Sequence, residues 1–324
     1  MNLNLRKVIV VFGAGSIGER HIRNLWKLGY ENIYVFRQRN LPFRDIAEIP
    51  VNVITTFEEL DRINAFAAII ASPTSQHIQQ TIQCVKRGIH VLVEKPLAHT
   101  LEGMELLENE LKNSSIYVHV GYMNRFHPHI KTIQKFIQEK SYGNLISIHS
   151  KWAEYLPDWH PWEDYRDSYA SRKDLGGGAA LTLSHDIDLA CYLANSEISI
   201  YHTIKNRLCN LEINVEAGAD FLVKFNNGIT ANIHLNFYEK VKERFLKLIF
   251  DNASVQFDFF TSMLSVKTPE GISQEVLESF DRNDLFIDQS KYFFQKIQDG
   301  FKPDDSIRQI RDSYQIIKMC NNEQ

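Results

Sequence analysis

Three side chains of this 324-residue sequence have the types and settings that proton transfer near neutral pH requires: Lys95, His185 and Asp188. Lys95 follows an apolar run at residues 89–93, where desolvation lowers the pKa of an ammonium group, and precedes Pro96, which favours an extended backbone. His185 and Asp188 lie three residues apart on a predicted helix, so the carboxylate can orient the imidazole and raise its basicity. The alternatives are a surface lysine in a loop and a histidine with a structural role.

A glycine-rich turn lies near the start of the chain, between an apolar run and a helix-like segment. Its sequence, GAGSIG, contains Gly13, Gly15, Ser16, Ile17 and Gly18. The first glycine permits a tight turn, the second lets backbone NH groups approach a pyrophosphate, and the third lets helix and strand pack closely. The amino end of the following helix adds partial positive charge for the phosphates. Between a strand and a helix, this motif predicts a dinucleotide site.

The cofactor preference is expected to depend on the residues after the second predicted strand. In NAD-binding domains an acidic residue there binds the ribose 2′-hydroxyl group, but this chain has Arg37, Gln38 and Arg39. A carboxylate would repel a 2′-phosphate, whereas two guanidinium groups hold one by charge-assisted hydrogen bonds. NADP(H) is therefore the expected cofactor. NAD(H) is the alternative, which applies if both arginines only face solvent.

The elements that position these groups follow from the hydrophobic pattern. Over residues 7–120, short runs that are apolar on both faces alternate with helix-period segments, which predicts an α/β domain with a doubly wound parallel sheet. We expect strands at residues 8–12, 33–36, 51–54, 67–71, 89–93 and 116–120, and helices at residues 19–28, 75–87 and 100–111. Ligands of such sheets bind at the carboxyl ends of the strands, which is where Lys95 is expected.

The pattern changes after Gly121. One-sided alternation and short turns there predict a mostly antiparallel sheet with one covered face. We expect strands at residues 146–151, 198–205, 217–225, 230–236, 245–250, 255–259 and 263–267, and helices at residues 128–140, 284–299 and 306–319. A chain of this length usually exceeds one core, so two domains are predicted, residues 1–121 and residues 122–324.

Residues 151–174 are rich in aromatic side chains, with charged residues between them. Trp162, Tyr165 and Arg172 are candidate substrate-binding residues, because aromatic rings stack on the CH faces of sugars and guanidinium groups bind hydroxyl or phosphate groups. We therefore expect a carbohydrate site. Because arginines bind anions, a sugar acid or a nucleotide-sugar is among the candidate substrates. The alternative is a packed loop that closes the domain or contacts another subunit, since aromatic residues are also enriched at interfaces.

The composition limits the expected partners and compartment. The net charge of −4 shows no basic excess, so nucleic acid is not an expected partner. The four cysteines lie far apart without CxxC or metal-site spacing, which predicts reduced thiols and no metal centre. The first apolar stretch is too short for a signal peptide, and no run reaches the ~18 apolar residues that span a bilayer. These features predict a cytoplasmic protein without membrane association.

Several motifs of the chain occur together in one known family. They are the glycine-rich turn extended to His21, Ala71-Ser72-Pro73-Thr74 followed by His77, Glu94-Lys95-Pro96 after Val93, the segment of residues 121–128, and the glycines at 176–178 with His185 and Asp188. Each motif alone has low specificity. Their combination over nearly the whole chain resembles the glucose-fructose oxidoreductase, inositol dehydrogenase and rhizopine-catabolism (Gfo/Idh/MocA) family.

The resemblance implies a Rossmann domain followed by a substrate-binding α+β domain whose large open sheet often mediates dimers or tetramers. Members of the family transfer a hydride between nicotinamide C4 and a carbon of a sugar, polyol, sugar acid or nucleotide-sugar. A small-molecule carbohydrate is thus the expected substrate, and a homodimer or homotetramer the expected assembly. The aromatic segment is loosely similar to relatives in surface-carbohydrate pathways.

The resemblance also assigns roles to residues of the motifs. It places Lys95 beside both nicotinamide and substrate and makes His185 the proton donor or acceptor. Asp188 is a third catalytic candidate because of its spacing from His185 on the predicted helix. The further cofactor contacts that it implies are Ser72, Pro73, Thr74, His77 and Glu94, and the further substrate contacts are Tyr122 and Arg125.

One position departs from the family pattern. Members often have an aspartate four residues before the histidine, but this chain has Leu181 there, or Thr182 when the position is counted from the glycines. The spacing is also one residue shorter. An acidic member of the proton relay is therefore absent, and Asp186 and Asp188 are the candidates to replace it.

Two other functions agree with the same motifs. A dinucleotide-sensing regulator would bind the cofactor without catalysis, but it would have no use for Lys95 and His185 together. A redox-neutral enzyme with tightly held NAD(P), catalysing dehydration or glycoside cleavage, would use both residues.

Overall fold

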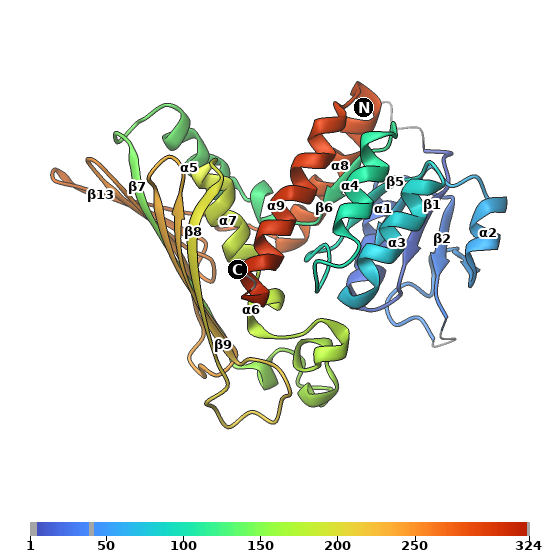
Figure 1. The fold of residues 1–324 in the computed structure, drawn as a ribbon, viewed down its shortest axis with the longest axis horizontal. Coiled ribbons are helices and arrows are strands. Elements are labelled where there is room, and N and C mark those ends of the chain that lie inside the picture. Colours follow the sequence, from blue (N-terminus) through green and yellow to red (C-terminus); the bar gives the residue numbers. More distant parts are fainter. Residues whose placement is uncertain (1–4, 39–41, 323–324) are drawn as a thin grey trace. The chain divides into compact units, whose positions relative to one another are not determined.

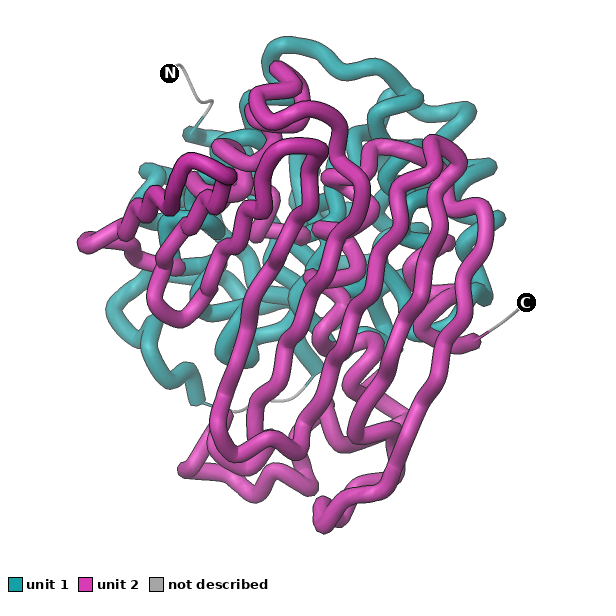
Figure 2. Tube along the Cα trace, turned by 90° about the vertical axis from the view of Figure 1, so that its left-hand side faces the viewer, with its two compact units in different colours: residues 1–121, 283–314 teal, residues 122–282, 315–324 magenta. Residues whose placement is uncertain are grey.

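The computed structural model describes residues 5–38 and 42–322, which form two compact units. Unit 1 comprises residues 1–121 and 283–314, and unit 2 comprises residues 122–282 and 315–324, as coloured in Figure 2. The change of unit after Gly121 lies where the hydrophobic pattern changes. The C-terminal helices differ from the expected division, because residues 283–314 pack in unit 1. There Phe293 stacks near Tyr117 and Phe294 packs on Tyr30, with ring centroids 5.8 Å and 4.6 Å apart.

Unit 1 contains a six-stranded parallel sheet, whose first strands are labelled in Figure 1. Its order is β3-β2-β1-β4-β5-β6, and the strands are β1 (Ile9–Phe12), β2 (Ile33–Phe36), β3 (Asn52–Ile54), β4 (Ala67–Ile70), β5 (His90–Val93) and β6 (Val118–Val120). Every residue of β1 and β4 is buried, as expected for strands covered on both faces. The predicted doubly wound sheet is confirmed.

The helices of unit 1 connect these strands and add the C-terminal pair. They are α1 (Ser16–Lys27), α2 (Phe57–Arg62), α3 (Thr74–Lys86), α4 (Met104–Lys112), α8 (Arg282–Asp299) and the first part of α9 (Pro303–Asn321). Helix α2 is absent from the sequence prediction. A capping box marks its start, since the Thr56 side chain accepts from the Glu59 amide and the Glu59 side chain accepts from the Thr56 amide.

Unit 2 contains an eight-stranded sheet in the order β14-β13-β12-β11-β7-β10-β9-β8. The strands are β7 (Leu145–Ala153), β8 (Ile198–Asn206), β9 (Gly218–Phe225), β10 (Thr230–Asn236), β11 (Glu243–Phe250), β12 (Ser254–Asp258), β13 (Met263–Thr268) and β14 (Gly271–Val276). All neighbouring pairs are antiparallel except β7 with β10. The predicted mostly antiparallel sheet is confirmed, with β14 as an additional strand.

One face of this sheet is covered by helices of the same unit, and the other is open. Helices α6 (Ala179–Thr182) and α7 (His185–Ala194) pack on β7, β9 and β10, while α5 (Pro128–Gln138) follows a short 3-10 turn. The opposite face, turned to the viewer in Figure 2, exposes Ile200, Ile204 and Leu222. Alternate residues of each strand therefore face different surroundings, as the one-sided pattern predicts.

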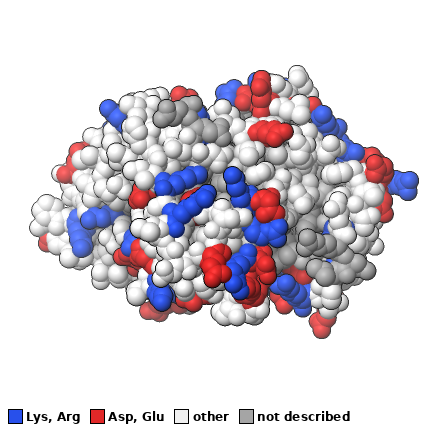
Figure 3. Space-filling view, turned by 60° about the horizontal axis from the view of Figure 1, so that its bottom comes forward, with Lys and Arg blue, Asp and Glu red and all other residues white. Residues whose placement is uncertain are grey.

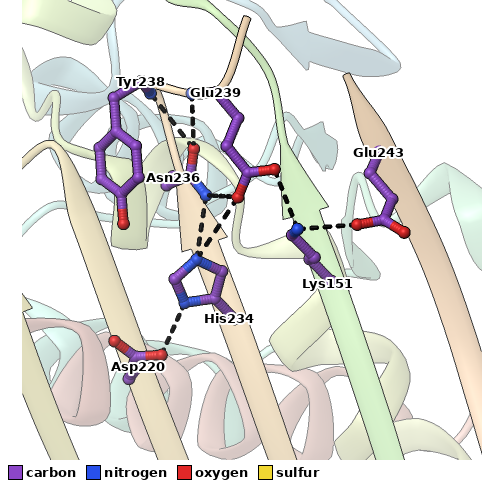
Figure 4. A network of polar contacts seen from close by, with 7 residues as sticks. All are labelled: Lys151, Asp220, His234, Asn236, Tyr238, Glu239 and Glu243. Atoms are coloured by element: carbon purple, nitrogen blue, oxygen red, sulfur yellow. Dashed lines mark hydrogen bonds and ion pairs between the residues drawn. The ribbon is translucent and has the colours of Figure 1, made fainter. Parts of the chain in front are cut away.

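A polar network lies on the open face at the ends of four strands (Figure 4). The Lys151 ammonium group forms ion pairs of 2.9 Å with Glu239 and 2.7 Å with Glu243. His234 Nδ1 lies 2.6 Å from the carboxylate of Asp220 on the neighbouring strand. The network thus joins β7, β9, β10, β11 and the turn after β10, and it reinforces the register of these strands.

No described helix is both long and apolar enough to cross a bilayer. Among the residues that the structure describes, no group of three or more His, Cys, Asp or Glu side chains is arranged to hold a metal ion. Figure 3 shows acidic and basic side chains interspersed on the displayed face, so charge there does not gather by sign.

Candidate active site

The glycine-rich turn has the backbone form of a phosphate-binding loop. Gly13 has φ +88°, and a Cβ atom on it would lie 2.8 Å from the Ala71 carbonyl oxygen. A Cβ atom on Gly18 would clash with the Gly13 carbonyl oxygen, whereas one on Gly15 would meet no atom within 4 Å. Helix α1 begins within this motif, so that Ser16 and Ile17 form the start of its first turn. Two glycines are thus required by close packing, and the third leaves room beside the helix start for a ligand.

The segment after β4 lies against this turn. Its Ser72 hydroxyl donates to Gln80 Oε1 at 2.6 Å, and Pro73 is the residue directly before helix α3, which starts at Thr74. His77 is buried on α3, with Nε2 2.8 Å from the Ser72 carbonyl oxygen. The ring of His77 therefore contacts the backbone of the segment, while Ser72, Pro73 and Thr74 lie at the carboxyl end of the sheet.

Lys95 lies at the carboxyl end of β5, half-buried, and is joined to Pro96 by a cis peptide bond. The preceding Glu94 has a side chain only 12% exposed, and its Oε1 lies 2.8 Å from Nε2 of His21 on α1. Burial alone would raise the pKa of Glu94, but the bond to His21 and the charges of His21, Lys95 and His77 lower it below the usual range. Glu94 is therefore a carboxylate at neutral pH.

The arginines expected to select the cofactor are only partly described. The guanidinium group of Arg37 lies over the Phe43 ring, 4.1 Å from the centroid, and its backbone NH donates to the Ile54 carbonyl. Arg39 lies outside the described residues. Glu19, which is buried in the first turn of α1, accepts from the amides of Arg44 and Asp45 at 3.0 Å and 2.8 Å. This carboxylate holds the segment after β2 close to the glycine-rich turn.

In unit 2, His185 is the first residue of α7 and is buried. Its ring meets Tyr122 edge-on and stacks near Trp152, with centroid distances of 5.8 Å and 6.2 Å. Burial raises the pKa of the Tyr122 hydroxyl well above its usual value, and the charge of Asp188 adds to this. Tyr122 therefore keeps its proton at neutral pH and cannot act as a base there.

The two carboxylates beside His185 each have an arginine partner. Asp188 accepts from Arg125 Nε at 3.0 Å and Nη2 at 2.5 Å, a bidentate arrangement in which the carboxylate is buried. Asp186 is fully buried, and its Oδ2 accepts from Arg244 Nη2 at 2.6 Å. Both candidates for the missing acid are therefore already charge-compensated, which weakens their effect on the basicity of His185.

Arg244 is a residue that sequence reasoning missed. Its guanidinium group lies between the Trp152 and Phe259 rings, 3.6 Å and 4.0 Å from their centroids. The sequence contained one signal for this residue. Side chains alternate between the two faces of a strand, so Arg244 faces the same side of β11 as the buried Leu246 and Leu248. A charged residue at an inward position of an amphipathic strand indicates a buried partner.

The segment between the glycines and His185 has no acidic residue. Leu181 and Thr182 are both buried in the short helix α6, so neither supplies the absent carboxylate. Gly178 has φ +109°, and a Cβ atom there would clash with the carboxylate of Glu216, which accepts from the Ala180 amide at 3.1 Å. This glycine lets the chain pass closely over Glu216 before it reaches His185.

After Trp152, which belongs to β7, the aromatic segment continues in short 3-10 turns. The Tyr165 hydroxyl accepts from the Glu212 amide at 3.1 Å, and Arg172 forms an exposed pair with Asp174 at 2.6 Å. Trp162 is 73% exposed. None of these contacts involves His185, so the structure does not join the three predicted substrate residues of this segment to the His185 group. Lys95 itself belongs to unit 1 and His185 to unit 2.

Comparison with known protein families gives a clear match for both units. The model of an oxidoreductase family with an NAD-binding Rossmann fold, Gfo/Idh/MocA, matches residues 7–122, and the model of the family's C-terminal domain matches residues 130–256. The chain belongs to the Gfo/Idh/MocA family. The predicted family, and with it the assignment to an NAD(P)-dependent oxidoreductase, is confirmed.

Curated relatives in the family include several dehydrogenases. 4-Carboxy-2-hydroxymuconate-6-semialdehyde dehydrogenase of Sphingobium sp. (strain NBRC 103272 / SYK-6) is 22% identical, over 95% of this chain and 96% of that protein. Levoglucosan dehydrogenase of Pseudarthrobacter phenanthrenivorans is 31% identical, over 38% of this chain and 32% of that protein. Myo-inositol 2-dehydrogenase of Thermotoga maritima is 24% identical, over 68% and 65%. The chain thus spans nearly all of one relative and only part of the other two.

Solved structures share the fold over nearly the whole chain. Levoglucosan dehydrogenase in complex with NADH and L-sorbose has a TM-score of 0.85 at 17% identity, covering 98% of this chain and 95% of that chain. UDP-N-acetylglucosamine 3-dehydrogenase from Acidithiobacillus ferrooxidans has a TM-score of 0.77 at 15% identity, covering 98% and 96%. At these identities the likeness establishes the arrangement of the chain in space.

Proposed function

We propose that this enzyme is an NADP(H)-dependent dehydrogenase or reductase that acts on a CH–OH group of a sugar, polyol, sugar acid or nucleotide-sugar. The observation that carries the proposal is the position of Lys95, half-buried at the carboxyl end of β5 in the same unit as the glycine-rich turn. Levoglucosan, inositol and UDP-N-acetylglucosamine dehydrogenases among its relatives support a carbohydrate substrate. A role in surface-carbohydrate metabolism is part of the proposal.

The residues of unit 1 fit a dinucleotide. Gly15 leaves open space beside the first turn of α1, and the amides there offer donors and partial positive charge to a pyrophosphate. Ser16, Ile17, Ser72, Pro73, Thr74 and Glu94 surround the same edge of the sheet and are proposed to hold the cofactor. His77 supports that group through the Ser72 backbone.

The proposed chemistry divides between hydride and proton. When bound, the nicotinamide supplies or accepts the hydride. Loss of a hydride from an alcohol carbon leaves a carbonyl only if the hydroxyl proton also departs, so a base near the oxygen is required. Lys95 is proposed to bind and polarise this oxygen, and His185 to exchange the proton. Asp188, held by Arg125, is proposed to support His185 from α7.

The substrate contacts are proposed for unit 2 and the cofactor for unit 1. Tyr122, Arg125, Trp162, Tyr165 and Arg172 would bind hydroxyl, phosphate or carboxylate groups of the substrate. The test is a panel of levoglucosan, myo-inositol, glucose 6-phosphate and UDP-N-acetylglucosamine, each assayed by nicotinamide absorbance with NADP⁺ and with NAD⁺. Turnover of at least one compound supports the proposal. Nicotinamide that copurifies without redox turnover would instead indicate redox-neutral chemistry.

The preference for NADP(H) over NAD(H) rests on Arg37 and Arg39. The stacking of Arg37 on Phe43 places a cation directly after β2, where the 2′-phosphate of NADP(H) is expected. Titrations should give tighter binding of NADPH than NADH, and Arg37→Ala/Arg39→Ala should remove most of the difference. Lys27→Ala, at an exposed position in the last turn of α1, is the control. Equal binding of both cofactors by the unaltered enzyme contradicts the preference.

We further propose a homodimer or homotetramer formed through the open face of the large sheet. Ile200, Ile204 and Leu222 are 54%, 69% and 56% exposed on adjacent strands of this face, and covering them would remove apolar surface from water. Sedimentation velocity should show an oligomer that Ile204→Glu/Leu222→Glu dissociates. Val241→Glu, at a loop residue 84% exposed, is the control. A monomer in the unaltered enzyme contradicts this part.

A reducing compartment such as the cytoplasm is proposed for the enzyme. The support is that no disulfide joins Cys84, Cys191, Cys209 and Cys320, all of which belong to the described part of the chain.

A further inference from the structure

The Glu94-Lys95-Pro96 loop is held on both sides of its lysine by buried histidines. On one side, His21 Nε2 lies 2.8 Å from Glu94 Oε1. On the other side, His77 Nδ1 lies 2.8 Å from the Pro96 carbonyl oxygen. The side chain of His21 is 0% exposed and His77 is 2% exposed, so neither contact is exchanged readily for water.

Each histidine also reaches a second segment of the proposed cofactor site. His77 Nε2 lies 2.8 Å from the Ser72 carbonyl oxygen, so one ring joins the loop after β5 to the segment after β4. His21 lies on α1, one turn after Gly18, so its contact with Glu94 joins the same loop to the helix that starts at the glycine-rich turn. Three segments from three strands are thus connected through two rings.

We propose that His21 and His77 are positioning residues that fix Lys95 relative to the dinucleotide-binding segments of unit 1. The inference rests on the proposed function of Lys95. Neither ring needs to touch cofactor or substrate for this role, and for His77 this replaces the expected direct cofactor contact. The role predicts that loss of either ring loosens the lysine loop and impairs turnover more than it impairs cofactor binding.

A purely space-filling role does not account for these contacts. An apolar side chain would fill the same volume, whereas here nitrogens of two buried rings meet oxygen atoms at hydrogen-bonding distance at three points, of which the contact with Pro96 is fully buried. The neutral ring of His77 donates to one of its two carbonyls, and the imidazolium donates to both. Glu94 carries its charge facing His21, Lys95 and His77, so removal of His21 leaves a carboxylate with fewer partners beside the lysine.

The test compares polar and apolar replacements of the two rings with a matched histidine. His21→Leu and His77→Leu remove all donors, while His21→Gln and His77→Gln keep an amide donor. His90→Gln is the control, because His90 lies at the opposite end of the same strand, where its Nδ1 accepts from the Tyr117 amide at 3.0 Å. All variants are first compared by thermal unfolding, so that a general loss of stability is recognised.

Hydrogen exchange followed by mass spectrometry is the primary measurement and requires no substrate. Both leucine variants should exchange the backbone amides of Glu94, Lys95, Leu97 and Ala98 about tenfold faster, since a lost hydrogen bond is worth about that factor. The glutamine variants should recover part of the protection, and His90→Gln should leave it unchanged. NADPH affinity should stay within about threefold of the unaltered enzyme in all variants.

Turnover supplies the second measurement, with whichever compound of the panel reacts. The leucine variants should lower kcat about tenfold or more with little change in the KM for the dinucleotide. His21→Leu should also move the acid limb of the kcat profile to higher pH, because the pKa of Glu94 rises when His21 is removed. Unchanged exchange and unchanged kcat in both leucine variants would overturn the inference. If Lys95→Met also retains full turnover, the proposed function has failed instead, because the loop then carries no reacting group.

Discussion

At the residue scale, the two carboxylates that follow His185 in the sequence each form an ion pair with an arginine. Asp186 and Asp188 both lie in the first turn of α7, where Asp186 binds Arg244 and Asp188 binds Arg125. A buried carboxylate without a partner carries a large desolvation cost, so each arginine is required by the carboxylate that it meets. The first turn of α7 is thereby fixed to β11 by Asp186 and to the turn after β6 by Asp188.

Removal of Arg244 should destabilise unit 2 strongly. Arg244→Met leaves Asp186 buried without its cation, which typically costs about 3–5 kcal/mol. Arg244→Met combined with Asp186→Asn should recover a large part of that loss, because the amide is neutral and can still accept from Ser150. Urea unfolding of the single and double variants measures the coupling. Additive losses in the double variant would show that the pair is not the source of the cost.

Acid sensitivity should arise in part from His127. Burial lowers the pKa of His127 to about 3, and its Nδ1 accepts from the His129 amide at the start of α5. The folded protein thus resists a proton that the unfolded chain binds below pH ~6.5, so stability falls as pH decreases from that value towards 3. His127→Asn keeps an N-cap acceptor without the titration. Its melting temperature should be lower at pH 7 but should decline less between pH 7 and pH 5. An unchanged decline would assign the acid sensitivity elsewhere.

At the element scale, the glycine-rich turn requires glycine at position 13 for two reasons. The residue has a left-handed φ angle, and a side chain there would overlap with neighbouring backbone atoms. Gly13 and Gly88 have φ values of +88° and +72°, so both are left-handed, but only Gly13 faces backbone atoms at a Cβ position. Substitution at Gly88 therefore measures the free-energy cost of the left-handed φ angle alone, whereas substitution at Gly13 also includes the cost of the steric overlap.

Alanine at these two sites should therefore have different effects. Gly88→Ala should cost about 1 kcal/mol, the usual cost of a left-handed alanine. Gly13→Ala adds an overlap with the Ala71 and Ser72 backbone, so it should cost more and should also abolish the increase in melting temperature on adding NADPH. Thermal unfolding with and without NADPH checks both statements. Equal losses in the two variants would show that the Ala71 contact is unimportant.

The sequence predicts most elements but few of their contacts. Strands β2 and β10 begin and end where the hydrophobic pattern places them, since burial on one or both faces is written in the residue types. The partners of Asp186 and Glu94 are not predictable in this way, because Arg244 and His21 lie 58 and 73 residues away in the chain. Spacing along a helix or strand contains no information on such pairs, which tertiary packing brings together.

At the scale of the whole molecule, residues 283–314 belong to unit 1 although they follow unit 2 in the sequence. Phe293 and Phe294 of α8 pack on Tyr117 and Tyr30, and Ser306 of α9 accepts from the Val118 amide at 2.9 Å. The hydrophobic pattern identified these helices but not their unit, because an amphipathic helix can cover either sheet. Unit 1 is therefore discontinuous in sequence.

A fragment of residues 1–121 should fail to fold stably alone. It leaves the rings of Tyr30 and Tyr117 without the aromatic partners that bury them in the intact chain. The same fragment linked through a short glycine-serine linker to residues 283–314 should unfold cooperatively and bind less of a dye for exposed apolar surface. Cooperative unfolding of residues 1–121 alone, at the same temperature as the linked form, would contradict the proposed dependence on α8.

In the proposed reaction, Lys95 acts at the reacting oxygen while other parts of unit 1 hold the cofactor. The most direct measurement is Lys95→Met in two assays, NADPH titration and turnover of the reactive compound of the panel, with exposed Lys135→Met on α5 as the control. NADPH affinity should stay within about threefold and turnover should fall by about 10²- to 10³-fold, the range for loss of one hydrogen-bond donor at a reacting oxygen. Full turnover in Lys95→Met, with the control equally active, would contradict this role of Lys95.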